Sequence, residues 1–570
     1  MRTRNTLTGG RAAVIASTLL LLIPLALLAT VLSLPDLVRG SFLAIPAHGE
    51  LALLVLVIWW ADGPGRRRRL VRRAAGVALG YLIGFAVAEA GVRWVYARPF
   101  SPGIDIPMVR SLIQLGLGPV GPLADILTPI VIVVIFTAFF AIGIAVESTV
   151  TALWRRLPAP RAAGASAVGV IVLAATVAGF VGGSVPVVHS FTAWGDRPGL
   201  HLREVTLDSG PAATGIPETA PTTTNAHDTP VYRFPGILDR DIYVFAIEAY
   251  GYATVTHREI AEALAPDRQS LEAAFRSRGY RVVSSYLRSP VAGGFSWLAE
   301  ATFLTGQWID SQAAFEELYD AEVPSLTGVL QAAGYRTSTV RPGTVHGAWP
   351  EGWDLYRFED ALIAYDGDFD YHGPWFSYVA VADQYAIRAG DRWVKRAIAP
   401  GGVAADRPLL AYYQLVSSHT PFNRIPPYLA DWSSLGNGAV YNELSDRILT
   451  FDNTWTGGTQ LVEGYTAAIS YVLRTLAGYV RGEMDVSRSP IVVIFGDHQA
   501  QRPIREPNAH LSVPIHIASP DPAVLQAFVD RGFRRGMVSD EAPPHRAMSD
   551  FFPLFIDVAR GAPPTAAGGG

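Results

Sequence analysis

The sequence predicts two parts of different fold class: an N-terminal bundle of about five transmembrane helices, and a C-terminal α/β domain with a mainly parallel central sheet. Long apolar runs fill residues 1–185, which we assign to the membrane. Residues 186–237 are rich in Thr, Pro, Ala and Gly and are expected to form an extracytoplasmic linker. Short apolar strands alternate with amphipathic helices over residues 238–560, and we expect a disordered tail at 561–570.

Composition agrees with a membrane portion joined to a water-exposed domain. Hydrophobic residues make up 50% of the chain, charged residues only 17%, and the mean hydropathy is +0.24. The net charge of −4 provides no basic field for nucleic acid, so no nucleic-acid partner is expected. The chain has no cysteine, which excludes disulfides, zinc-thiolate sites and thiol catalysis.

Apolar runs long enough to cross a bilayer as helices lie at 12–34, 42–61, 74–95, 123–146 and 165–185. The first run is too long for the apolar core of a signal peptide, and no small-residue cleavage site follows it. We therefore expect it to be retained as a span. Neither broken helices nor an internal repeat is evident, which argues against a transport pathway through these segments.

Arginine clusters predict the orientation of the bundle. One cluster lies at 66–73, between the second and third spans, and another at 155–161, between the fourth and fifth. Together with the arginines that precede the first span, these clusters fall on one side, which the positive-inside rule makes cytoplasmic. The N-terminus is then cytoplasmic, and an odd number of spans places the α/β domain outside the cell membrane.

The α/β prediction rests on the alternation of short apolar runs with longer amphipathic ones. Strands are expected at 242–247, 280–286, 337–340, 409–416, 491–495 and 515–518. Helices are expected at 260–278, 325–333, 381–397 and 464–481. Such alternation is typical of a largely parallel sheet that is covered by helices on both faces.

Several of the expected strands end in side chains that can bind a metal or act in catalysis. Glu248 follows the first strand, His419 follows the fourth, and Asp497 and His498 follow the fifth. Ligands of open α/β sheets bind outside the carboxyl ends of the strands, so we expect these side chains on one rim. Each has a simpler explanation as a turn or loop residue, but their occurrence together favours a site.

Ser296 is expected on the same rim, at the start of a helix. It follows Gly293-Gly294-Phe295 and precedes a helix-favouring run. Amide groups and the helix dipole make such a position suitable for a phosphate. The alternative is that Ser296 serves only as an N-cap, because serine is a common cap residue.

Glu248, Asp497 and His498 would supply two carboxylates and one imidazole, with Ser296 adding a hydroxyl oxygen. This mainly oxygen set suits Mn²⁺, with Mg²⁺ or Zn²⁺ as the alternatives. A divalent ion would lower the pKa of the serine hydroxyl and neutralise charge on an attacked phosphate. We therefore predict phosphoryl-type transfer through a covalent phosphoserine.

Three stretches are similar to those of a known family: Phe245-Ala-Ile-Glu248-Ala-Tyr250, Gly293-Gly-Phe-Ser296-Trp-Leu-Ala-Glu300 and Phe495-Gly-Asp497-His498. With the layout of spans, linker and α/β domain, the chain resembles the lipoteichoic-acid-synthase-like phosphoglycerol transferases of the alkaline phosphatase/sulfatase superfamily. The resemblance implies that Glu248, Asp497 and His498 bind the metal, that Ser296 is the nucleophile, and that His419 binds substrate.

The resemblance also implies the reaction. Such enzymes take phosphoglycerol from phosphatidylglycerol, release diacylglycerol, and pass the group to a hydroxyl of a glycolipid or polysaccharide in the cell envelope. The family often grips the substrate phosphate with a Trp and an Arg, but the corresponding region here does not match residue for residue. Arg341, His346 and Trp349 are therefore candidate substrate-binding residues, with packing or surface roles as the alternative.

Rival functions differ in what they require of the sequence. A sulfatase needs Cys or Ser in a C/S-x-P-x-R motif, whereas Ser296 is followed by Trp-Leu-Ala-Glu. A G-x-S-x-G hydrolase needs glycine where Leu298 stands. Phosphoethanolamine transferases of the same superfamily, whose exported domains carry disulfides, are the enzymatic alternative. Another phosphodiester hydrolase, or a non-catalytic scaffold that binds the envelope, remains a further possibility.

Overall fold

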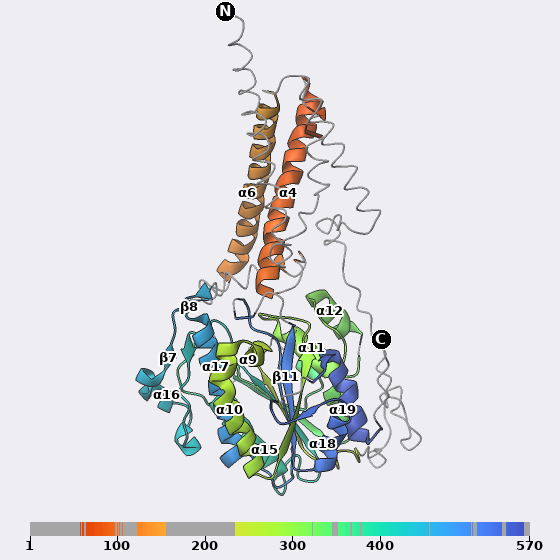
Figure 1. The fold of residues 1–570 in the computed structure, drawn as a ribbon, viewed down its shortest axis with the longest axis vertical. Coiled ribbons are helices and arrows are strands. Elements are labelled where there is room, and N and C mark those ends of the chain that lie inside the picture. Colours follow the sequence, from red (N-terminus) through yellow and green to blue (C-terminus); the bar gives the residue numbers. More distant parts are fainter. Residues whose placement is uncertain are drawn as a thin grey trace, which may run out of the picture. The chain divides into compact units, whose positions relative to one another are not determined.

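The structure is a computed structural model that describes residues 57–58, 60–61, 64–96, 100, 102, 105–106, 122–155 and 234–563, the last range with gaps at 322, 345–350, 365–367, 377–378, 455–456, 503, 506–509 and 539–542. The chain divides into two compact units, 1–199 and 200–570, each of which is described by itself (Figure 1). The division falls within the predicted linker at 186–237.

Two helices in the described part of the first unit are long and apolar enough to cross a membrane. Helix α4 (Arg66–Tyr96) contains the predicted span 74–95, and α6 (Pro122–Trp154) contains the predicted span 123–146. The predicted spans at 12–34 and 165–185 lie outside the described residues, and 42–61 lies almost entirely outside them. Two apolar helices are thus observed in place of the five expected, and the larger number stays a prediction.

Glycines allow α4 and α6 to pack closely against each other. A Cβ atom on Gly80 would lie 2.3 Å from the carbonyl oxygen of Phe139, and one on Gly143 would lie 2.1 Å from that of Gly76. Close backbone approach through small residues is the usual way in which membrane helices associate. At one end of this pair, the buried Glu147 binds Arg72 at 2.5 Å and Arg73 at 3.1 Å.

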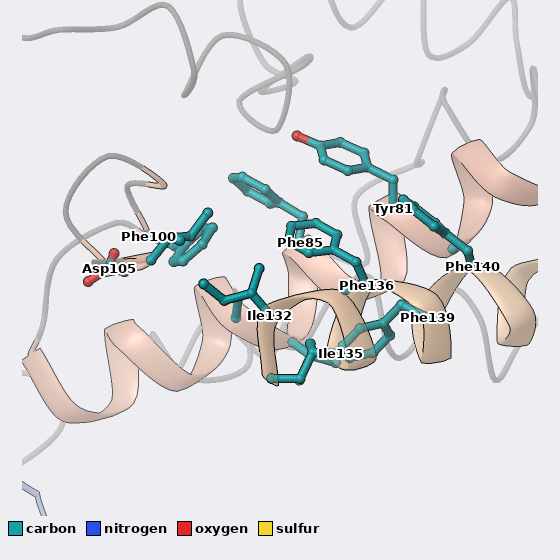
Figure 2. Close-up of a pocket in the computed structure, with 14 residues that line it drawn as sticks. Tyr81, Phe85, Phe100, Asp105, Ile132, Ile135, Phe136, Phe139 and Phe140 are labelled. Atoms are coloured by element: carbon teal, nitrogen blue, oxygen red, sulfur yellow. The ribbon is translucent and has the colours of Figure 1, made fainter. Parts of the chain in front are cut away.

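An apolar cavity of about 300 Å³ lies beside these two helices. Figure 2 shows its wall, which is built mainly from aromatic rings and isoleucines, with Asp105 at one end. The labelled lining residues are Tyr81, Phe85, Phe100, Asp105, Ile132, Ile135, Phe136, Phe139 and Phe140. Such a wall offers few hydrogen-bond partners, so the cavity has room for hydrocarbon and favours it over polar groups.

Within the described residues, a nine-stranded sheet forms the centre of the second unit (Figure 1). Its strands are β1 (Ile242–Ile247), β2 (Arg281–Arg288), β3 (Arg336–Arg341), β4 (Asp360–Ile363), β5 (Leu409–Leu415), β10 (Ile491–Gly496), β11 (Ser512–Ser519), β12 (Arg534–Arg535) and β13 (His545–Ala547). Their order is β12-β2-β11-β10-β1-β5-β3-β4, with β13 beside β2. The strands from β10 to β4 are parallel, and β11 is antiparallel to its neighbours. The prediction of a mainly parallel sheet is confirmed.

Helices cover both faces of the sheet (Figure 1). One face carries α10 (Arg258–Ser277), α15 (Asp383–Ile398) and α17 (Leu461–Gly478), and the other carries α11 (Ser296–Thr305), α18 (Pro522–Val529) and α19 (Phe551–Arg560). The shorter elements are α9 (Ala253–Thr256), α12 (Gln312–Asp320), α13 (Leu326–Ala332), α14 (Glu351–Asp354), α16 (Val440–Glu443), β6 (Arg424–Ile425), β7 (Leu449–Thr450), β8 (Asn453–Thr454) and β9 (Gly457–Gly458). The main apolar core lies between the sheet and the helices α10, α15 and α17.

All six expected strands and all four expected helices of this unit are observed, with shifted ends. Short elements such as β4, β12 and β13 were not expected, because two to four residues show no clear periodicity. The last residues of the predicted linker already belong to the domain. Phe234 is buried, and the amide of Gly236 donates to the carbonyl oxygen of Ala559 at 2.8 Å.

His516, on β11, predicts how acid affects the second unit. Its ring is buried between the hydroxyls of Ser284 and Tyr250, at 2.6 and 3.2 Å. Burial lowers the pKa of His516 to about 3, and the charge of Arg268 adds to this effect. In the unfolded chain, His516 therefore binds a proton below about pH 6.5, whereas in the folded domain it stays neutral down to about pH 3.

The free energy of unfolding should therefore fall as the pH drops from about 6.5 to 3, by up to about 1.4 kcal/mol per pH unit from this residue. We expect His516→Gln to remove one proton from the acid-dependent slope, measured by denaturant unfolding at several pH values. His372→Gln, at an exposed histidine, is the matched control. An unchanged slope in His516→Gln would contradict the assignment.

Candidate active site

Two neighbouring parallel strands deliver the carboxylates of the site. β1 pairs with β10 so that Ile247 lies opposite Gly496. Glu248 and Asp497, the next residues of each strand, therefore leave the sheet side by side. The amide of Ala249 then donates to the Asp497 carboxylate at 2.8 Å, which ties the two strand ends together.

Ser296, Glu248 and His498 meet at a single point. The Ser296 hydroxyl donates to Glu248 Oε2 at 2.9 Å and lies 3.2 Å from His498 Nε2. His498 Nε2 is 3.1 Å from Glu248 Oε1 and 3.7 Å from Asp497 Oδ2. Both carboxylates and the imidazole are buried, whereas Ser296 is half-buried. The structure thus brings together the four side chains that were predicted to form the site.

A strained loop presents Ser296. Gly293, Gly294 and Phe295 have φ values of 73°, 140° and 65°. The first two suit glycine, but a left-handed conformation at a phenylalanine costs on the order of 1 kcal/mol. The amide of Gly293 donates to the carbonyl oxygen of Gln499 at 2.7 Å, so the loop is fastened to the segment that carries His498.

Ser296 does not cap its helix. Phe295 occupies the N-cap position of α11, and no side chain makes a capping hydrogen bond there. Ser296 is instead the first residue of the helix, and its hydroxyl turns toward Glu248. The N-cap alternative is therefore not what the structure shows. Oγ lies at the positive end of the helix, where backbone amides favour an anion.

The three titratable groups strongly perturb one another. Burial would raise the pKa of Glu248, but the charges of His419 and His498 outweigh it and lower this pKa to about 2. Burial and the charge of Glu248 raise the pKa of Asp497 to about 7. Against burial, the two carboxylates raise the pKa of His498 to about 9. The cluster therefore favours a positive charge at its centre.

The donor set fits a divalent metal ion. One ligand atom from each of Glu248, Asp497 and His498 lies within 4.8 Å of the others. His498 Nδ1 is 2.9 Å from the carbonyl oxygen of Gln499, which can only accept, so Nδ1 carries the hydrogen. Nε2 faces the carboxylates, and once its proton has left, its lone pair would point where a metal ligand requires it. Two carboxylates and one imidazole suit Mn²⁺, Mg²⁺ or Zn²⁺.

His419 lies on the loop after β5, which is anchored to the same rim. The Ser418 hydroxyl donates to the carbonyl oxygen of Glu248 at 2.6 Å, and Asp383 accepts from the amide of Ser417 at 3.0 Å. His419 is half-buried, and its Nδ1 is 2.7 Å from the carbonyl oxygen of Thr420. Against the effect of burial, the charge of His419 does more than that of any other group to lower the pKa of Glu248.

Arg341 is not presented to solvent. It is 2% exposed and makes a two-pronged ion pair with Glu300, in which Nη1 lies 3.0 Å from Oε2. Glu300 is one turn along α11 from Ser296, so the pair braces the helix that carries the predicted nucleophile. His346 and Trp349 lie outside the described residues, and their proposed substrate contacts stay predictions.

Several residues that support the site were not predicted from the sequence. Phe303, on α11, stacks on Phe495 with ring centroids 3.8 Å apart and on Phe551 at 4.5 Å. Tyr465 donates its hydroxyl hydrogen to the carbonyl oxygen of Ala249 at 2.8 Å. The position of Phe495 directly before Gly496 and Asp497 could have signalled a packing partner, but nothing in the sequence identifies that partner as Phe303.

The loop geometry predicts the effect of a single methyl group. We expect Gly294→Ala to destabilise the second unit by about 1–3 kcal/mol, because an L-residue at φ 140° is strained. Turnover should fall further than stability does, because Ser296 moves. Gly482→Ala is the matched control, since a Cβ there meets no atom within 4 Å. Equal effects of both variants would refute this account of the loop.

Metal content tests the ligand assignment. We expect Asp497→Asn and His498→Ala to lose bound Mn²⁺, measured by metal analysis after dialysis, whereas Ser296→Ala should retain it. Asp241→Asn is the control. Asp241 is an equally buried carboxylate, but it lies before β1 and binds the amide of Leu409 at 2.8 Å and Arg488 at 3.0 Å. Full metal content in Asp497→Asn would show that the assignment is wrong.

Comparison with known proteins finds similarity in structure only. No protein-family model matches the sequence, and no curated protein matches it. The lipoteichoic acid synthase LtaP from Listeria monocytogenes is 15% identical, with a TM-score of 0.34, over 49% of this chain and 65% of that one. The chain therefore matches just under two thirds of the Listeria protein.

Two further solved structures are similar to this chain. The phosphoethanolamine transferase EptA from Neisseria meningitidis is 11% identical, with a TM-score of 0.44, over 94% of this chain and 95% of that one. The phosphoglycerol transferase GacH from Streptococcus pyogenes is 11% identical, with a TM-score of 0.36, over 58% and 82%. At these identities the likeness concerns the fold alone.

Proposed function

We propose that this protein is a metal-dependent phosphotransferase anchored in the cell membrane, with its catalytic domain outside. It would transfer phosphoglycerol from phosphatidylglycerol to a hydroxyl of a glycolipid or polysaccharide, through a covalent intermediate on Ser296. The observation that carries the proposal is the position of the Ser296 hydroxyl, which lies 2.9 Å from Glu248 and 3.2 Å from His498 at the start of a helix.

Glu248, Asp497 and His498 would hold the metal ion. When bound, a divalent cation would lower the pKa of the Ser296 hydroxyl and neutralise negative charge on the phosphate. Mn²⁺ is the proposed ion. Glu248 also orients the nucleophile, because it accepts the hydrogen of the Ser296 hydroxyl and leaves a lone pair of Oγ directed away from the carboxylate.

Side chains and backbone amides of this chain would carry out both steps, the transfer of phosphoglycerol to Ser296 and its transfer from Ser296 to the acceptor. Ser296 Oγ would attack phosphorus as its hydroxyl proton passes to Glu248, so that a P–O bond forms and the bond to diacylglycerol breaks. The backbone amides at the start of α11 face the phosphate oxygens. His419 would protonate the departing diacylglycerol oxygen and later accept the proton of the acceptor hydroxyl. That hydroxyl oxygen would attack phosphorus and release Ser296, which takes its proton back from Glu248.

The membrane part fits a lipid donor. Helices α4 and α6 are long and apolar enough to cross a bilayer, and the arginines at the start of α4 match the predicted cytoplasmic cluster. A domain tethered in this way stays beside the lipids on which it would act. This argument supports a phospholipid as the donor and an envelope component as the acceptor, and it applies equally to phosphatidylethanolamine.

Turnover of labelled phospholipid tests the function. We expect Mn²⁺-loaded protein to release diacylglycerol from phosphatidylglycerol, and Ser296→Ala to reduce this rate at least about a thousand-fold because it removes the nucleophile. Mass spectrometry of quenched protein should find glycerol phosphate on the peptide that contains Ser296. Ser277→Ala, at an exposed serine at the end of α10, is the control.

The same assay separates the alternatives. Release of diacylglycerol from phosphatidylethanolamine and not from phosphatidylglycerol would identify a phosphoethanolamine transferase. Release without an acceptor adduct would identify a hydrolase. Absence of turnover with either lipid in metal-loaded protein would favour the non-catalytic scaffold.

A further inference from the structure

A buried arginine lies on the segment that follows the metal ligands. Arg505 is 2% exposed, and its Nε and Nη2 atoms have no hydrogen-bond acceptor among the described residues. Ala500 and Ile504 of the same segment are fully buried in the main apolar core, which holds the segment in place. The packing of this segment therefore positions the Arg505 guanidinium, whose Nε and Nη2 atoms are unpaired among the described residues.

Other buried arginines of this unit have acceptors. Arg268 is 6% exposed and donates to the carbonyl oxygens of Thr254 and Ala261, each at 2.8 Å. Arg341 binds the carboxylate of Glu300. Burying a charge without a counter-charge or acceptors costs several kcal/mol, which folding tolerates at a site that serves a ligand.

Positive charge is concentrated at this place. Burial lowers the pKa of Arg505 to about 10, and the charge of Arg502 adds to that effect. Burial also lowers the pKa of Arg502. Burial disfavours the charge of both guanidinium groups, so an anion beside them would stabilise them, and their planar donor arrays suit phosphate.

The segment adjoins the proposed reaction centre. Arg505 lies seven residues after His498 in the sequence, and the amide of Arg505 is 3.4 Å from the carbonyl oxygen of Gln501. The Gln501 side chain donates to Thr420 Oγ1 at 2.6 Å, which connects the segment to the loop that carries His419. The segment that carries Arg505 is thus joined to the loop that carries His419, the residue proposed to exchange protons with the leaving and attacking oxygens.

We propose that Arg505, with Arg502 beside it, binds a phosphate-class anion carried by one of the two substrates. The proposal rests on the transferase function. Two sources supply this chemistry: the phosphodiester of the donor lipid, or a phosphate already present on the acceptor. Arg505 is a binding residue in either case, and its cost to stability is offset when the anion is bound.

Thermal unfolding of the full-length, Mn²⁺-loaded protein in detergent, with and without inorganic phosphate, tests the site independently of turnover. We expect Arg505→Met to raise the unfolding midpoint without phosphate, because it removes an uncompensated buried charge. The matched variant Arg268→Met should lower it. Arg505→Met should also weaken phosphate binding roughly ten-fold or more, since charge-assisted hydrogen bonds are lost.

Two results would overturn the proposal: a lower midpoint in Arg505→Met like that in Arg268→Met, or phosphate binding as tight as in the wild type. Should Arg505→Met fail to fold, Arg502→Gln replaces it and is expected to weaken phosphate binding. Because these measurements need no catalysis, they can succeed even if phosphoglycerol transfer is disproved.

Kinetics identify the source of the anion. A KM for phosphatidylglycerol that rises roughly ten-fold or more in Arg505→Lys, with the acceptor KM unchanged, would assign the site to the donor phosphate, because lysine loses the two-pronged geometry. The reverse pattern would assign it to an anionic acceptor. An unchanged KM for both substrates would refute the proposal even if inorganic phosphate binds.

Discussion

The alignment of β1 with β10 is the constraint on which the site depends. With Ile247 opposite Gly496, the two strands end together, and Glu248 and Asp497 enter the same buried space. Two carboxylates in such a space repel each other and lack water, so a positive charge is needed between them. His498 partly supplies it in the structure, and its raised pKa of about 9 reflects that demand. A divalent cation meets the same demand.

Helix α11 is held as a rigid support for Ser296. Phe303 stacks between Phe495 and Phe551, and Glu300 is paired with the buried Arg341. The backbone before the helix is fastened to Gln499. These contacts stabilise the left-handed conformation at the residue before Ser296, and they explain why the serine faces the carboxylates without the help of a cap.

Several ionisable groups whose charged form is disfavoured by burial lie at the rim of the sheet. Asp383, whose pKa burial raises to about 7, holds the loop that leads to His419, and Arg505 is buried beside Arg502. Groups of this kind lower stability unless a ligand or a partner compensates them, so their concentration at one edge is typical of a functional site. At the opposite, amino ends of the strands, Asp241 pairs with Arg488 and a backbone amide, although burial still raises its pKa to about 6.

The sequence by itself determined the α/β class, the main strands and helices, and the rim residues Glu248, Asp497 and His498. These follow from periodicity and from the rule that parallel strands end at one edge, which are local properties of the chain. Only the tertiary structure decided that Ser296 is not a cap, that Arg341 braces Glu300, and that Arg505 is buried without an acceptor among the described residues. Those facts depend on contacts between segments that are far apart in the sequence. Local periodicity predicts neither the order of the strands nor the packing of side chains between them.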